Sequence, residues 1–299
     1  MIALFLCRIS CLRWGLIAVA IACAACSPRH LIVQGLAAEL ANQGQAPEDD
    51  LVLAREASGF YLKLSESLLR ETPGNLPLAE AVAGGFTQYA YAFVQFEADR
   101  LDALDAKAAQ KLRARAAGLY RRAHQHAMAA LAHQYPGFLA ALANTDDKRW
   151  PRLTGDQIGI AYWAAASWGG LIALSKDDPN TVADLPLAIR LAQLAYGVSP
   201  AHGAGSLASL MGSLEAARPG GSLAQAEIYF DQAIQLGDGG NAGAYLAKAE
   251  SIPLATGDRA AFDTLLNQAL AASGRQRNLQ NSVMRERALW LQDTAGDLF

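Results

Sequence analysis

The sequence predicts an all-α protein made of stacked antiparallel helical hairpins. Three observations support this fold class. Ala, the best helix former, is by far the most frequent residue, whereas Val and Ile, which favour strands, are sparse. Apolar residues recur with the period of a helix, and no segment shows the sustained alternation of a half-buried strand. Short turns rich in Gly, Pro and Asp separate the periodic segments, as between antiparallel neighbours in a helical stack.

Residues 1–25 are predicted to be a signal peptide. Arg8 and Arg13 precede a short apolar run at 14–22, and the first 26 residues contain no acid. A basic start, a short apolar segment and small residues before the cleavage point are typical of secretory signals. The run is shorter than the roughly 20 residues that a transmembrane helix needs. All four cysteines lie in this segment, so no disulfide or cysteine-based site is expected in the mature domain.

The end of this segment, Ala24-Ala25-Cys26-Ser27, resembles the lipobox of bacterial lipoproteins, in which the Cys receives lipid and becomes the mature N-terminus. Cys26 is therefore predicted to be lipidated, and residues 26–48 to be a lipidated tether with one short helical stretch. Cys23 offers a rival register, and a plain cleaved signal is a further alternative. Lipid chains would anchor the protein firmly without a spanning helix.

Residues 49–299 are predicted to form one all-α helical-repeat domain. Its first helix begins after the acidic pair Asp49-Asp50 and ends before Pro73-Gly74. Two long helices are expected at 77–101 and 106–132. The later helices are expected at 137–145, 156–175, 184–196, 203–217, 222–236, 241–255, 258–273 and 278–293.

Three of these helices carry a spacing found in the second helix of tetratricopeptide hairpins. An Ala is followed four positions later by an aromatic residue or Ala, and three further by another Ala. The matches are Ala116, Tyr120 and Ala123; Ala188, Ala192 and Ala195; and Ala226, Phe230 and Ala233. The first Ala residues of the matches lie 72 and 38 residues apart instead of a uniform 34. The pattern therefore predicts degenerate tetratricopeptide-like repeats in a closed or distorted stack.

Short runs along the mature chain resemble the TRAP-transporter-associated T-component family. The similarity covers about residues 45–299, with one departure at residues 57–59, where Ala-Ser-Gly replaces a more apolar, Pro-containing stretch. The runs are 49–51, 60–69, 73–75, 86–94, 97–101, 115–123, 136–138, 162–163, 168–169, 174–179, 182–186, 277, 281, 287–291 and 297–299.

This resemblance implies a periplasmic lipoprotein, anchored by its N-terminal lipid, with the outer membrane favoured over the inner. It implies association with a TRAP-type transporter and work with a periplasmic solute-binding partner. It also implies that the helical repeats are arranged around a channel or groove. The assembly implied is a homotrimer pierced by channels that bind or pass an apolar or amphipathic small molecule. The alternative function is a helical-repeat lipoprotein scaffold that organises an envelope protein complex through its concave face.

Two groups of aromatic residues are the candidate lining of a ligand channel. Phe86, Tyr89, Phe93 and Phe96 are spaced to share one face of an α-helix. Tyr162, Trp163 and Trp168 lie in a later apolar helix. Ordinary packing between hairpins would use the same residue types, so both interpretations stay open for these seven residues.

No catalytic, metal or cofactor site is predicted. His124, His126 and His133 lack the i, i+4 spacing of helical zinc ligands. Ser206 and Ser209, near His202, lack the Gly-x-Ser-x-Gly context of a hydrolase nucleophile. The net charge of −3 gives no basic surface for nucleic acid. We therefore expect a protein that is not an enzyme and binds no nucleic acid.

Overall fold

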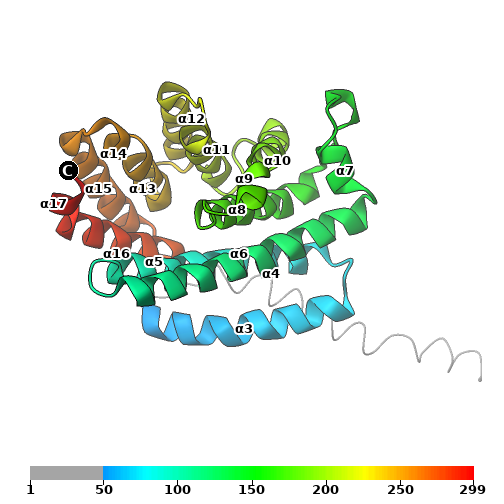
Figure 1. The fold of residues 1–299 in the computed structure, drawn as a ribbon, viewed down its shortest axis with the longest axis horizontal. Helices are drawn as coiled ribbons and strands as arrows, with labels where there is room; N and C mark the ends of the chain where they lie inside the picture. The colour runs from blue at the N-terminus through cyan, green and yellow to red at the C-terminus, as the bar shows by residue number, and fades with distance from the viewer. Residues whose placement is uncertain (1–49) are drawn as a thin grey trace, which may run out of the picture.

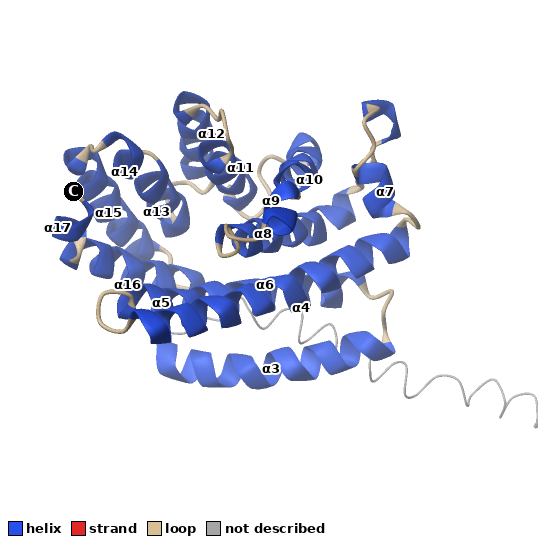
Figure 2. Cartoon of the chain, in the orientation of Figure 1, coloured by secondary structure: helices blue, strands red, loops and turns tan. Residues whose placement is uncertain are grey.

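The computed structural model describes residues 50–299. In this range the chain forms helices and no strands, which confirms the all-α prediction (Figure 2). The predicted signal peptide, the tether and both candidate lipidation sites, Cys26 and Cys23, lie outside the described residues. Within residues 50–299, no helix combines the length and the apolar character needed to cross a bilayer.

The first part of the domain consists of three long helical segments, each started by a polar side chain. The Asp50 carboxylate accepts hydrogen bonds from two backbone N–H groups of the first helix, and Asn75 and Asp105 each accept one at the next two helices. Residues 90–95 form a π-helical turn, so the single α-helix predicted at 77–101 is corrected at this point. These elements are α3 (Leu51–Glu71), α4 (Leu76–Tyr89), η2 (Ala90–Gln95), α5 (Phe96–Leu101) and α6 (Ala106–Gln134).

The remaining helices begin and end within a few residues of their predicted positions. The predicted helix at 241–255 is divided, because Pro253 lacks the N–H that would continue the helical hydrogen bonds. Short helices η3, α9 and α17 are additional. The elements are α7 (Phe138–Leu142), η3 (Asp147–Arg149), η4 (Gly155–Gln157), α8 (Ile158–Ala173), α9 (Pro179–Ala183), α10 (Leu185–Val198), α11 (Ser206–Ala217), α12 (Leu223–Leu236), α13 (Ala242–Ser251), α14 (Pro253–Thr256), α15 (Arg259–Arg275), α16 (Leu279–Asp293) and α17 (Ala295–Leu298).

Successive helices pack in pairs, and the pairs stack on one another (Figure 1). The pairs are α4 with α6, α8 with α10, α11 with α12, and α13 with α15. The first helix of each pair also packs against the first helix of the next, and α13 packs against α16 in the same way. The stack curves, so that α16 returns to lie beside α5 (Figure 1).

Glycines let the paired helices approach closely. The ring of Tyr120 in α6 lies directly against Gly170 of α8, and the ring of Phe230 in α12 lies against Gly212 of α11. Both aromatic residues are buried, as are the six Ala residues of the predicted repeat motif and Ala192. The motif spacing therefore marks helix faces in close contact with a neighbouring helix.

Helix α3 is tied to α6 by one buried carboxylate. Glu66 is 3% exposed and accepts hydrogen bonds from Arg122 Nε at 2.5 Å, His126 Nε2 at 2.9 Å and Lys63 Nζ at 2.7 Å. Burial by itself would raise the pKa of this carboxyl, but the bonds from Arg122, Lys63 and His126 outweigh burial and lower the pKa from 4.5 to about 2.

Adding a methyl group at Gly212 should destabilise the fold. A Cβ at this position would lie 2.9 Å from the Phe230 ring, so the helices must separate. We expect Gly212→Ala to lower the free energy of unfolding by about 1–3 kcal/mol in urea titrations followed by circular dichroism. The matched control is Gly118→Ala in α6, where a Cβ has open space. It should raise stability by up to about 1 kcal/mol through helix propensity, and equal effects of the two variants would contradict this account.

The contribution of Glu66 to stability should disappear in acid. Because the pKa in the folded state lies below the unfolded value, this contribution is complete above about pH 4.5 and is lost as the pH falls towards 2. We expect Glu66→Gln to be less stable than the wild type by about 2–3 kcal/mol at pH 7, with the difference shrinking between pH 4.5 and 2. Urea unfolding across this range measures it. The exposed Glu56→Gln is the control, and a difference for Glu66→Gln that is constant with pH would refute the assignment.

Candidate functional site

The π-helical turn η2 places polar and aromatic side chains at the contact between the two ends of the stack. The Tyr120 hydroxyl of α6 donates a hydrogen bond to Gln95 Oε1 at 2.7 Å. The guanidinium of Arg287, on α16, lies 5.4 Å from the ring centres of both Tyr91 and Phe96. The indole of Trp290 meets Phe96 edge to face at 5.6 Å. Since π-turns are frequent at functional sites, this region is a candidate site.

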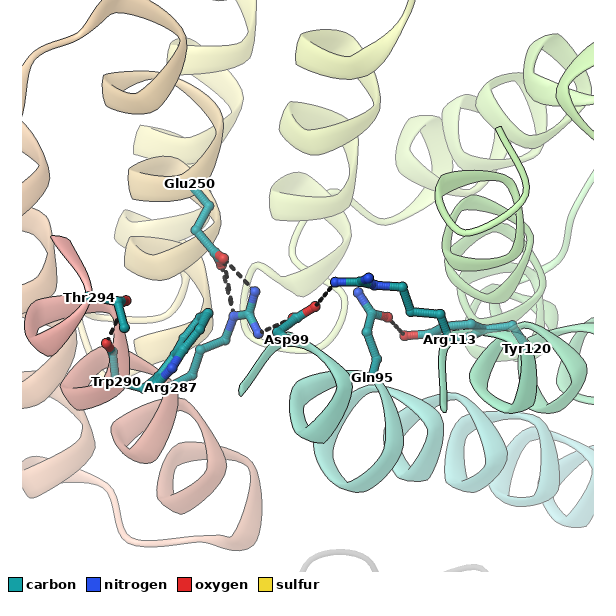
Figure 3. A network of polar contacts seen from close by, with 8 residues as sticks. All are labelled: Gln95, Asp99, Arg113, Tyr120, Glu250, Arg287, Trp290 and Thr294. Carbon is teal, nitrogen blue, oxygen red and sulfur yellow. Dashed lines mark hydrogen bonds and ion pairs between the residues drawn. The ribbon is translucent and has the colours of Figure 1, made fainter. Parts of the chain in front are cut away.

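Arg287 is the centre of a charged network at this contact (Figure 3). Its side chain is 10% exposed. Arg287 Nη1 donates to Asp99 Oδ2 of α5 at 3.1 Å, and Nη2 donates to Glu250 Oε1 of α13 at 2.5 Å. Arg113 of α6 lies 3.9 Å from the other Asp99 oxygen. One guanidinium therefore joins α5, α13 and α16.

The network holds fixed charges. Burial raises the pKa of Asp99, although Arg287 acts in the opposite direction. Burial would lower the pKa of Arg287, but Tyr91, Glu250 and Asp99 raise it above its usual range. Burial also raises the pKa of the Tyr91 phenol to about 12. At neutral pH the phenol stays protonated and the guanidinium stays charged.

The first predicted aromatic group divides between two contacts. Phe86 is buried against α6, where its ring stacks on His126 with the ring centres 6.1 Å apart. Phe96 is buried against Trp290 of α16. Tyr89 and Phe93 lie between them and contact each other at 5.5 Å. A π-turn holds more residues per turn than an α-helix, so the ring positions after it are offset from the single face expected of an uninterrupted α-helix. Their role in lining a channel stays a prediction.

The second predicted group also divides. Trp168 is buried, and its ring lies 4.3 Å from the ring of His124 on α6. Tyr162 and Trp163 are only partly buried and meet edge to face at 4.7 Å. The indole of Trp163 lies directly against Gly84 of α4.

The Tyr162–Trp163 pair of α8 is uncharged and contacts both α4 and the segment that precedes α11. Tyr162 lies 5.5 Å from the ring of His202, which precedes α11. Burial raises the pKa of the Tyr162 phenol to about 12, although a hydrogen bond with Ser206 acts to lower this pKa. Burial also lowers the pKa of the His202 imidazole. These rings stay neutral at pH 7. They offer apolar edges and π faces to a bound molecule where α4, α8 and the start of α11 come together.

The histidines have separate partners. His126 bonds to Glu66, and His124 Nδ1 lies 3.2 Å from the carbonyl oxygen of Ala164. Among residues 50–299, no three His, Cys, Asp or Glu side chains are placed to hold a metal ion.

The charged network was not singled out from the sequence. Asp99 and Arg287 are separated by 188 positions, and Glu250 belongs to a third helix. The sequence pointed to these residues in one way: Asp99 and Arg287 lie in the runs 97–101 and 287–291, which resemble a known family.

The part of the chain that matches known proteins contains both aromatic groups and the charged network. A family model described as TRAP transporter T-component matches residues 47–299. An uncharacterized protein of Treponema pallidum (strain Nichols) is 27% identical over 262 residues, which cover 84% of this chain and 81% of that protein. The family match confirms the resemblance found in the sequence. The chain therefore belongs to the TRAP transporter T-component family and is a component associated with this type of transporter.

Proposed function

We propose that this protein is a periplasmic lipoprotein subunit of a TRAP-type transporter system. It binds or passes an apolar or amphipathic small molecule together with a periplasmic solute-binding partner, and it is not an enzyme. The observation that carries the proposal is the family match across residues 47–299. The sequence of the N-terminal segment, ending at Cys26, supports a lipid anchor, for which the outer membrane is the favoured location.

The ligand passage is proposed to run along the first helices of the stacked pairs. The pairing of α4 with α6, α8 with α10, α11 with α12 and α13 with α15 is the pattern of tetratricopeptide-like hairpins, with α16 as a further first helix. The contact of α16 with α5 supports a closed arrangement around a channel. The partly exposed Tyr162–Trp163 pair supports an aromatic wall, because such rings bury large apolar area with little loss of rotamer freedom.

The outer face of α3 is the proposed contact between copies in a homotrimer. Leu53, Phe60 and Leu64 lie at i, i+7 and i+11 on this helix and are 54%, 68% and 40% exposed. Val52 and Tyr61 beside them are 68% and 41% exposed. A contiguous apolar stripe on a surface helix is typical of an interface.

The second candidate is the scaffold function, in which the protein organises an envelope complex. The same α3 stripe favours it, because an exposed apolar helix face also serves binding of a different protein. The two candidates differ in whether the purified protein holds a small molecule and assembles with itself.

The purified protein should retain an apolar ligand. Native mass spectrometry after gentle delipidation should show it, and an uncharged fluorescent probe should displace it. We expect Trp163→Ala to weaken probe binding about tenfold, since losing one aromatic contact costs about 1.5 kcal/mol or more. Trp150→Ala is the matched control, because this indole stacks on Arg190 away from the Tyr162–Trp163 pair. If the protein is a monomer that holds no ligand and does not bind a solute-binding partner, the proposal is wrong.

The trimer should depend on α3. We expect Phe60→Ser to shift the protein from trimer to monomer at micromolar concentration in light-scattering measurements, because it places a polar group in the apolar stripe. Ile228→Ser removes an apolar side chain that is 58% exposed on α12 and should leave the assembly unchanged. An unaltered trimer in Phe60→Ser would place the interface elsewhere.

A further inference from the structure

A carboxylate without a partner lies beside the Tyr162–Trp163 pair. Glu80 is on α4, one helical turn before Gly84, and is partly buried. Within residues 50–299, no hydrogen bond or ion pair to its carboxylate occurs, whereas the buried Glu66 and the partly buried Asp99 and Glu250 each bind at least one Arg. Burial raises the pKa of Glu80, and no neighbouring charge offsets this effect.

Two glycines place Glu80 and Trp163 at neighbouring points of the contact between α4 and α8. The Glu80 carboxylate lies against Gly159 of α8, so that a Cβ at Gly159 would overlap its oxygen atoms. Trp163, one turn further along α8, lies against Gly84, whose added Cβ would be 2.8 Å from Trp163 Nε1. The two contacts are reciprocal and about 5.4 Å apart along the helices, which is one helical turn.

These polar atoms are still accessible to a bound molecule. In the described part of the chain, every fully buried side-chain nitrogen or oxygen has a hydrogen-bond partner. The Glu80 oxygens and Trp163 Nε1 have none there, so they reach solvent. No group among residues 50–299 forms a hydrogen bond with the Glu80 oxygens or Trp163 Nε1, so a ligand can bind both.

The charge of this cluster selects the ligand. Tyr162 and His202 are neutral at pH 7 because burial raises the pKa of the phenol and lowers that of the imidazole. The faces of Trp163 and Tyr162 carry the negative side of the ring quadrupole, which attracts cations. Glu80 adds the formal negative charge. A bound cation would also relieve the cost of burying an unpaired carboxylate.

We propose that Glu80, Trp163, Tyr162 and His202 form a binding site for the protonated amino group of an amphipathic ligand, with Glu80 as its counter-ion. The inference rests on the proposed function, because the apolar part of the same molecule would lie in the aromatic passage. The ammonium group donates hydrogen bonds to the Glu80 carboxylate and contacts the aromatic faces. The Trp163 N–H is available to an acceptor atom on the ligand.

The test compares three probes of equal chain length that differ in charge: n-octylammonium, n-octanol and n-octanoate. Calorimetric titration of the full mature protein at pH 7 measures the binding of each. We expect the order octylammonium, octanol, octanoate from tightest to weakest. In Glu80→Gln, octylammonium binding should weaken about tenfold or more, as expected for the loss of a charge-assisted bond, while octanol binding should change little.

The controls separate this site from folding and from the broader proposal. Glu56→Gln removes an exposed carboxylate from α3 and should leave all three affinities unchanged. Glu80→Gln should unfold at the same or a higher temperature than the wild type, since it removes a partly buried charge that has no partner among the described residues. Equal loss of octylammonium and octanol binding in Glu80→Gln, or preference of the wild type for octanoate, would overturn the site but leave the ligand passage standing. Absence of binding for all three probes would instead count against the passage itself.

Discussion

The contact between α5 and α16 depends on Arg287. A buried guanidinium is costly unless it is paired, and the effective penalty is several kcal/mol per ion. Arg287 meets this requirement with Asp99 from the start of the domain and Glu250 from a neighbouring pair, so its charge is satisfied only when both ends of the stack are in place. Asp99 and Arg287 are 188 positions apart. The contact therefore joins helices that lie far apart in the sequence.

Small residues set the distances between neighbouring helices in the stack. An Ala-rich chain with few charges has little means of specifying one partner for each helix by electrostatics. Instead, Gly84, Gly159, Gly170 and Gly212 each receive one large side chain from a neighbouring helix. Each contact fixes a register along two helices, because the side chain fits only opposite its glycine. The result is a stack in which shape, more than charge, decides which helices meet.

The same close approach produces the contrast between the two polar regions. At the α5–α16 contact, every carboxylate in the Arg287 network has a cationic partner, which favours a structural role. At the α4–α8 contact, Glu80 lies against Gly159 and Trp163 lies against Gly84, and neither side chain has a hydrogen-bond partner within the described residues. The Glu80 oxygens and Trp163 Nε1 reach solvent and have no partner among the described residues, so they are open to a bound molecule. The proposed ligand passage and the proposed ammonium site both follow from this distribution of satisfied and unsatisfied groups.

The sequence by itself determined the local structure. Helix propensity, capping residues such as Asp50, Asn75 and Asp105, and turns at Gly and Pro act over a few residues, so the helices were located to within a few positions. It also determined the family, through short runs spread over the chain. The π-turn at 90–95 was beyond its reach, because the turn arises where α4 continues into the contact with α6 and α16. Only the tertiary structure decided which of the aromatic residues are buried against a neighbour, that Arg287 meets Asp99 and Glu250, and that Glu80 has no partner. These outcomes depend on which distant helices lie together, and periodicity along one helix carries no information about the helix opposite.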